Sequence, residues 1–200
     1  MDSSEKTHRG WYTSRGLPHL DSPYTLQFIS FRLADSLPQE VLAGWRQQLL
    51  GLPNEERAAA MRQRMEDYLD HGLGCCVLAH PSLALTLQDA FKHHHAERYE
   101  LLAWCIMPNH VHVLIKPVWP LANIVQSWKV WSARWAREHA AVLSLDLPER
   151  GLWMRGYWDR YIRDERHLLV VIEYIHQNPV KAGLCARAED WLWSSASACC

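Results

Sequence analysis

Residues 104–116, Trp-Cys-Ile-Met-Pro-Asn-His-Val-His-Val-Leu-Ile-Lys, contain two apolar runs joined at a Pro-Asn pair. Such a pair is typical of a turn, so the stretch predicts two neighbouring strands. Side chains alternate between the two faces of a strand, which places His110 and His112 on one face and Val111 and Val113 on the other, toward a core. Two imidazoles on one face can hold one metal ion, although an ordinary half-exposed strand has the same alternation. We expect the histidine face to be open to solvent.

The composition is that of one globular domain. The chain has 200 residues, of which 48% are hydrophobic and 22% charged, and this is enough apolar material for a core. We expect a polar arm over residues 1–18, a single α+β domain over 19–195 with a helical insertion at 39–71, and a tail at 196–200. No stretch approaches the roughly 20 apolar residues of a membrane span, and we expect a cytoplasmic protein. The six cysteines lack zinc-ligand spacing, which predicts reduced thiols.

The charge is distributed unevenly. The net charge is −1, but residues 1–91 hold 8 basic and 11 acidic side chains, whereas residues 92–200 hold 13 and 11. The basic excess lies in 150–187, and this is a surface that phosphates can use, although a solvated helix face would have a similar composition. The residues that we expect to contact DNA are Arg155, Trp158, Arg160, Arg163 and Lys181. Arg160 could instead form a structural ion pair with Asp159 or Asp164.

Alternation and helical spacing predict one sheet with helices packed on it. The expected strands are 24–33, a short apolar run at 75–79, 99–107, 109–117 and 151–162, and the expected helices are 39–50, 55–69, 82–97, 121–140 and 165–177, the last one capped by Asp164. His93, His94 and His95 follow one another on a helix, so they cannot all face one ion and are interpreted as surface residues. The spacing of Trp128, Trp131 and Trp135 places three indoles on one helix face, for core packing or for stacking on an unpaired base.

The last predicted helix supplies a partner for the histidine pair. Tyr174 and Asn178 are four residues apart and therefore share a helix face. The Asn178 carbonyl oxygen can be a third ligand beside His110 and His112, in an open site suited to Mg²⁺ or Mn²⁺. A divalent ion that polarises a phosphoryl oxygen would help the Tyr174 phenol to attack the phosphorus.

The motifs resemble those of a known family. The stretches are Met107 to Leu114, Leu152 to Met154, Tyr157 to Arg163 and Tyr174 to Leu184, and over about residues 19 to 195 the chain resembles the REP-associated tyrosine transposases, which are HUH endonucleases related to the IS200-like transposases. The resemblance implies a ferredoxin-like antiparallel sheet with helices packed on one face. It also implies metal-dependent cutting and joining of single-stranded DNA hairpins by a monomer or weak homodimer, through a 5′-phosphotyrosine on Tyr174 with His110, His112 and Asn178 on the ion.

Two other functions fit the sequence. One is a non-catalytic binder of single-stranded nucleic acid on a ferredoxin-like sheet, in which aromatic side chains stack on bases. The other is a metal-dependent hydrolase of a small phosphate ester, in which Tyr174 is structural. The insertion at 39–71 has an acidic tilt that does not suit contact with DNA, and we expect it to affect assembly or to bind a protein.

Overall fold

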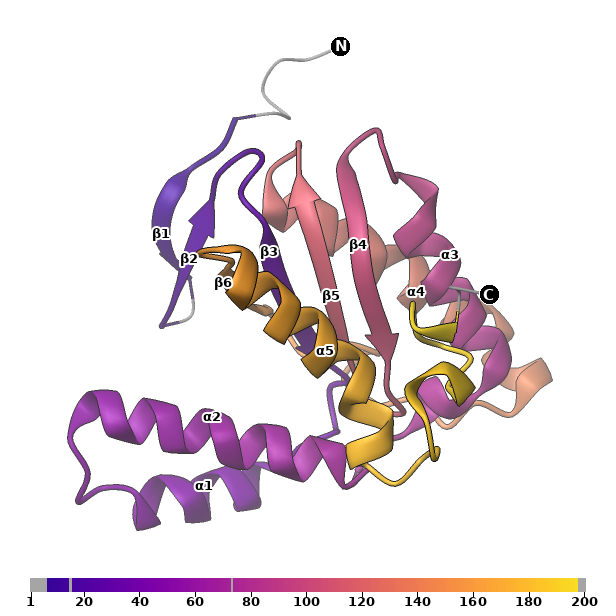
Figure 1. Ribbon diagram of the computed structural model, residues 1–200. Coiled ribbons are helices and arrows are strands. Elements are labelled where there is room, and N and C mark those ends of the chain that lie inside the picture. Colours follow the sequence, from indigo (N-terminus) through magenta and orange to yellow (C-terminus); the bar gives the residue numbers. More distant parts are fainter. Residues whose placement is uncertain (1–6, 15, 73, 198–200) are drawn as a thin grey trace.

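A computed structural model describes residues 7–14, 16–72 and 74–197, and its centre is a four-stranded antiparallel sheet (Figure 1). The strands β3 (Gln27–Arg32), β4 (Tyr99–Ile106), β5 (His110–Pro117) and β6 (Trp158–Tyr161) are ordered β4-β5-β3-β6. Helix α3 (Pro81–His93) joins β3 to β4 and helix α4 (Leu121–Leu143) joins β5 to β6. This βαββαβ order with the first and third of these strands at the centre is ferredoxin-like, so the predicted fold class is confirmed.

Helices α3 and α4 cover one face of the sheet and form the larger core with it. The alternation of β5 points Val111, Val113 and Ile115 into this core, where they meet Phe91 of α3 and Trp128 of α4. Burial of one large apolar side chain stabilises a fold by roughly 1.5–3 kcal/mol. Of the three indoles predicted on one face of α4, Trp128 is buried and Trp135 packs against the core, whereas Trp131 is 57% exposed, so the core-packing interpretation is wrong for Trp131 alone.

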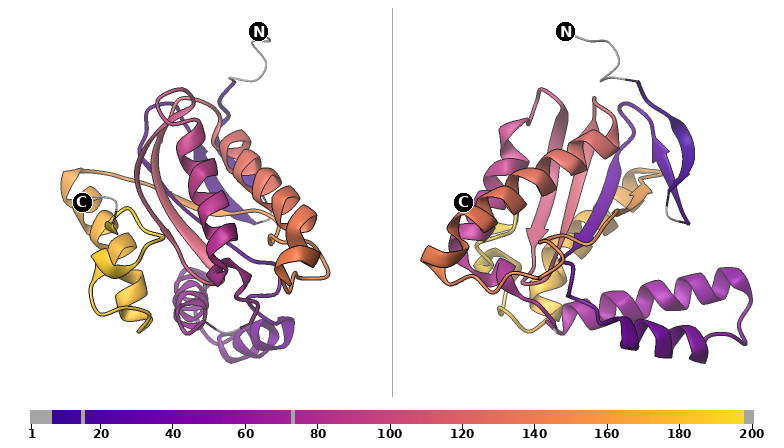
Figure 2. Two further views of the ribbon diagram at one scale, coloured as in Figure 1. Left: turned by 90° about the vertical axis from the view of Figure 1, so that its right-hand side faces the viewer. Right: turned by 180° about the vertical axis from the view of Figure 1, so that it is seen from behind.

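Helix α5 (Glu165–Lys181) lies on the opposite face of the sheet (Figure 2). The expectation that the helices share one face is therefore corrected, and the reason is that β3, β4 and β5 also present apolar side chains on this second face. Val171 and Ile175 of α5 pack there in a smaller core with Phe28 and Leu114. The predicted Asp164 cap is confirmed, since its carboxylate accepts a 2.7 Å hydrogen bond from the His167 backbone N–H.

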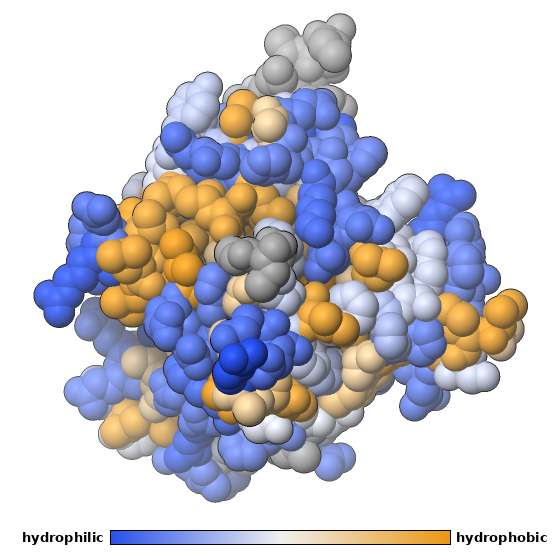
Figure 3. All heavy atoms as spheres, turned by 45° about the vertical axis from the view of Figure 1, so that its right-hand side comes forward, coloured by the Kyte–Doolittle hydropathy of each residue, from blue (hydrophilic) through white to orange (hydrophobic). Residues whose placement is uncertain are grey.

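The outer side of α5 stays in solvent. Leu169 and Val170 are 62% and 60% exposed, and Figure 3 shows apolar patches between largely hydrophilic areas on the surface. Among the described residues, no helix combines the length and the apolar character that crossing a membrane requires. The predicted reduced thiols are confirmed for Cys75, Cys76, Cys105 and Cys185, whereas Cys199 and Cys200 lie outside the described residues.

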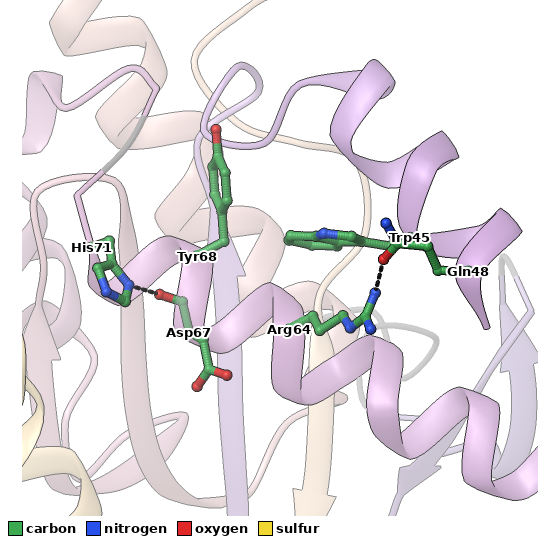
Figure 4. A pocket seen from close by; sticks show the side chains of 6 residues that line it. All are labelled: Trp45, Gln48, Arg64, Asp67, Tyr68 and His71. Atoms are coloured by element: carbon green, nitrogen blue, oxygen red, sulfur yellow. Dashed lines mark hydrogen bonds between the residues drawn. The ribbon is translucent and has the colours of Figure 1, made fainter.

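The predicted insertion is a helical hairpin that projects away from the sheet (Figures 1 and 2). It consists of α1 (Gln39–Gln48) and α2 (Asn54–Asp70), which contact each other through Trp45 and Tyr68 and through the Arg64–Gln48 hydrogen bond (Figure 4). Its two ends meet at Asp35 and Gly74. Gly74 has φ +80°, and a Cβ there would lie 2.6 Å from the Asp35 carbonyl oxygen, so glycine is required where the chain re-enters the fold.

Three sequence expectations about local structure are wrong. Residues 75–79 contain a 3₁₀ turn (Val77–Ala79) in place of a strand, and only Trp158–Tyr161 of the stretch 151–162 belongs to β6. The polar residues near the N-terminus form an antiparallel hairpin of β1 (Gly10–Ser14) and β2 (Leu17–Asp21). Residues 1–6 of the expected arm and 198–200 of the expected tail lie outside the described residues.

Polar contacts with distant parts of the chain hold the hairpin in place. The Asp21 carboxylate accepts hydrogen bonds from the backbone N–H groups of Arg9 and Leu121, both 3.1 Å long. His19 is buried and bonded to the buried Asp159 of β6. Because these anchors are polar, β1 and β2 do not have the apolar alternation that marks a strand in a sequence.

Candidate active site

The histidine pair lies on the face of β5 that α5 covers. His110 and His112 project to the same side, with their Nε2 atoms 2.9 Å apart. They are only 1% and 2% exposed, so the expectation of a solvent-facing position is wrong. Burial lowers the pKa of His110 to about 3, and burial and the neighbouring His110 lower the pKa of His112. Both imidazoles are therefore neutral at ordinary pH, the form in which histidine binds a metal ion.

Asn109 fixes the tautomer of His110. Its side-chain Nδ2 donates a 3.0 Å hydrogen bond to the Leu69 carbonyl oxygen at the end of α2. The amide oxygen then faces His110 and accepts a 2.7 Å hydrogen bond from its Nδ1–H. The lone pair of His110 is thus on Nε2, which points to His112. Metal-binding histidines are commonly oriented through their other ring nitrogen in this way, and the sequence indicated only a turn at Asn109.

Asp70, the last residue of α2, adds a carboxylate to the pair. Its Oδ1 lies 3.6 Å from the His110 Nε2, and the candidate ligand atoms of Asp70, His110 and His112 all lie within 4.8 Å of one another. Since His110 is neutral, this contact is not an ion pair. Burial raises the pKa of Asp70 to about 6, and the charges of Glu66 and Asp67 also raise it. Asp70 was not predicted from the sequence, because no local pattern indicates which residue of the insertion returns to the sheet.

Tyr174 and Asn178 share one face of α5, as predicted, and Tyr174 on this face contacts His112. The Tyr174 ring packs edge-on against His112, with centroids 5.3 Å apart, and against Phe28 at 5.8 Å. The Asn178 Nδ2 donates a 2.7 Å hydrogen bond to the Tyr174 carbonyl oxygen. Burial raises the pKa of the Tyr174 phenol, as do the charges of Glu66 and Asp70, while the neighbouring Asn178 side chain lowers it in part. The phenol is therefore neutral and needs activation before it can act as a nucleophile.

Unpaired polar atoms converge at this site. Among the described residues, four site atoms are buried and have no hydrogen-bond partner: Asp70 Oδ1, His112 Nδ1, Tyr174 Oη and Asn178 Oδ1. Each such atom costs roughly 1–3 kcal/mol, so a group of them calls for an explanation. Carboxylate and amide oxygens beside neutral imidazoles are suitable ligands for Mg²⁺ or Mn²⁺. The donor set therefore fits a divalent cation.

The predicted DNA-contacting residues are not all in one place. Lys181 follows the site on α5, with its Nζ 5.2 Å from the centre of the Tyr174 ring. Arg160 and Arg163 are exposed. Burial lowers the pKa of His167, and the charges of Arg160 and Arg163 lower it further, so both arginines lie near His167 at the start of α5. Trp158 is half-buried and packs edge-on against Phe28, and Arg155 is exposed in the preceding loop. Within the described chain, Arg160 has no ion pair with Asp159 or Asp164, and Asp159 binds His19 instead.

Comparisons with known proteins agree with the motifs. Residues 82–178 match the family model of the IS200-like transposases. A REP-associated tyrosine transposase of Escherichia coli K12 is 28% identical over 48% of this chain and 54% of its own length. A Haemophilus influenzae protein assigned to the same group is 29% identical over 48% of this chain and 58% of its own length. The chain thus spans little more than half the length of these curated relatives.

One similar solved structure is that of a REP-associated tyrosine transposase bound to a REP hairpin. It is 15% identical to this chain, with a TM-score of 0.49, and the match covers 88% of this chain and 79% of that one. The family match begins after the α1–α2 insertion and includes Tyr174, Asn178 and both histidines. The resemblance of this chain to the REP-associated tyrosine transposases, among the IS200-like transposases, is therefore confirmed.

Proposed function

We propose that the chain is a metal-dependent single-stranded DNA endonuclease and strand transferase that acts at REP-type hairpins, with Tyr174 as the nucleophile. One observation carries the proposal: the Tyr174 hydroxyl and the Asn178 oxygen are buried and unpaired beside a neutral histidine pair. A structural tyrosine would have its hydroxyl satisfied. The names of the relatives support a transposase acting at REP elements.

In the proposed reaction the Tyr174 oxygen attacks a phosphodiester phosphorus. The new bond joins this oxygen to phosphorus, the bond from phosphorus to the 3′ oxygen breaks, and the products are a 5′-phosphotyrosine and a free 3′-OH. The phenol loses its proton and the departing oxygen gains one. His110, His112 and Asn178 would hold Mg²⁺ or Mn²⁺, which when bound supplies the positive charge that polarises the phosphoryl oxygens. Packing of the Tyr174 ring between His112 and Phe28 limits its rotation and so helps to position the nucleophile.

The substrate would reach the site along basic side chains. Lys181 lies beside the Tyr174 ring, and Arg160 and Arg163 are exposed at the far end of α5, so a strand lying along this helix would meet positive charge at both ends. Arg155 and Trp158 would extend this contact toward β6. A monomer or weak homodimer associated with the nucleoid in the cytoplasm would suit this activity, and both properties remain predictions.

The test uses labelled single-stranded DNA hairpins from the genomic flanks of the gene. Wild type should cut them with Mg²⁺ or Mn²⁺ and not with EDTA, and a DNA-linked peptide containing Tyr174 should appear in the mass spectrum. Tyr174→Phe should bind the hairpin without cutting it, and Tyr161→Phe, whose ring is partly exposed on β6, should cut normally. Cutting by Tyr174→Phe would contradict the proposal. Binding without metal-dependent cutting would support the non-catalytic binder, and phosphate-ester hydrolysis without an adduct would support the hydrolase.

A further inference from the structure

We infer that Asp70 is a further ligand of the metal ion, so that the α1–α2 insertion contributes to the catalytic centre and closes it from one side. This inference rests on the proposed function and deepens it. Asp70 is the last residue of α2, far in sequence from β5 and α5. The family match begins only at residue 82, so this ligand lies outside the matched segment.

The Asp70 carboxylate lies where a metal ligand would have to lie. Asp70 Oδ1 is buried and has no hydrogen-bond partner within the described part of the chain, and it lies 3.6 Å from His110 Nε2. A carboxylate oxygen that served only solubility would be in water, and one that served only stability would have a donor. Two atoms that bind one ion approach each other at about this separation, since each lies roughly 2.0–2.6 Å from the metal.

A tether holds this end of α2 at the site. The Leu69 carbonyl oxygen, one residue before the ligand, accepts the hydrogen bond from Asn109 Nδ2, and the other side of the same amide orients His110. Leu69 itself is buried. A single side chain therefore links the backbone beside Asp70 to the histidine that Asp70 faces, and the two candidate ligands are positioned together.

The site needs a negative charge to bind a divalent cation firmly. Two neutral imidazoles and one amide oxygen have no negative charge, whereas hard divalent cations bind most firmly where carboxylates contribute. Asp70 would supply that charge. The C-terminal end of a helix, where Asp70 lies, carries partial negative charge and also favours a cation. Cation binding would then explain the excess of acidic residues in the insertion, in contrast to the role in assembly or protein binding that the sequence suggested.

The experiment measures the binding of Mn²⁺ to the full chain, by the loss of the free-ion electron paramagnetic resonance signal. Asp70→Asn keeps the shape and removes the charge, and the dissociation constant for Mn²⁺ should rise by at least about 10- to 100-fold, the loss that follows from changing residues that only orient a metal ligand. The matched control is Asp67→Asn, an exposed acid one turn earlier on α2, which should change the dissociation constant by less than about fivefold, as for a surface charge worth up to about 1 kcal/mol.

Hydrogen exchange provides a second readout that loss of charge alone would not move. Mn²⁺ should slow exchange of the backbone amides at the end of α2 in wild type and in Asp67→Asn, but not in Asp70→Asn. If wild type binds Mn²⁺ and Asp70→Asn binds it equally well, the inference is overturned while the proposed function stands. If wild type binds no Mn²⁺, the metal dependence of the proposed function fails, and the inference fails with it.

Discussion

The stability of the protein should change in opposite directions when Tyr174 and Tyr99 lose their buried hydroxyl groups. The Tyr174 Oη is buried without a partner, and an unpaired buried hydroxyl costs roughly 1–3 kcal/mol. Tyr174→Phe removes that oxygen and keeps the ring contacts with Phe28 and His112. The free energy of unfolding of the metal-free protein should therefore rise by about 1 kcal/mol, the lower end of that range.

Tyr99 is the matched control. Its hydroxyl donates a 2.8 Å hydrogen bond to the Phe91 carbonyl oxygen and accepts one of 2.8 Å from Trp128 Nε1. Tyr99→Phe leaves the buried indole N–H without its acceptor, so the protein should lose about 1–3 kcal/mol. Both variants remove one buried hydroxyl oxygen and keep the ring, and the difference in sign comes only from the hydrogen bonds in the structure.

The assay is urea unfolding at pH 7 in EDTA, followed by tryptophan fluorescence and checked by thermal melts. A change of 1 kcal/mol should move the melting temperature by about 2–4 °C in a protein of this size. Because burial raises the pKa of both phenols, the comparison is between neutral side chains. If Tyr174→Phe is destabilised as much as Tyr99→Phe, the Tyr174 hydroxyl has a structural partner and the reasoning about unpaired atoms is refuted.

Four further predictions concern the same site and its surroundings. His110→Ala and His112→Ala should stop DNA cutting and should also destabilise the fold by about 2–4 kcal/mol in urea titrations, since both side chains are buried and truncation leaves a cavity. Asn178→Ala should weaken Mn²⁺ binding without abolishing it, because one neutral ligand is lost and water can replace it. Calorimetry that detects no Mn²⁺ binding to this variant would contradict the prediction. The metal-free wild-type protein should lose stability as the pH falls from about 6.5 toward the lowered His110 pKa of about 3. Over this range His110 is protonated in the unfolded chain and stays neutral in the folded protein. A free energy of unfolding that does not change with pH in urea titrations would refute this prediction. The affinity for DNA hairpins should fall by roughly 0.7 log unit per log unit of salt for each phosphate contacted. Arg160→Glu or Arg163→Glu should remove such a contact and so make this salt dependence less steep. A salt dependence that stays the same in both variants would show that neither arginine contacts a phosphate.

Most of the fold was predictable because burial imposes a period on the sequence. The alternation of β5 and the helical spacing of α4 each reflect packing against one core. The β1–β2 hairpin was not predictable, because its anchors are polar and pair with residues far along the chain, such as Asp21 with Leu121 and His19 with Asp159. The position of α5 on the second face depends on tertiary packing, and the spacing of its apolar residues does not specify which face it covers.

The candidate site was predictable only where its geometry is local. The periods of a strand and a helix place His110 with His112 and Tyr174 with Asn178, and the structure brings Tyr174 against His112. Their burial was predicted wrongly, since it depends on α5 and on the end of α2. Asp70 was missed for the same reason, because its contact with His110 depends on where a long insertion returns to the sheet.

The distribution of unpaired atoms indicates what a bound cation would do to the protein. The unpaired atoms belong to three separate elements, α2, β5 and α5, and only β5 is held inside the sheet by pairing on both sides. In the absence of an ion, these atoms oppose the packing of α2 and α5 against the histidine face. A cation would satisfy oxygens from both helices at once, so its binding energy would contribute directly to the docking of α5 and of the α1–α2 insertion. A bound metal ion would then both support the proposed chemistry and hold Tyr174 and Asp70 in the arrangement that this chemistry needs.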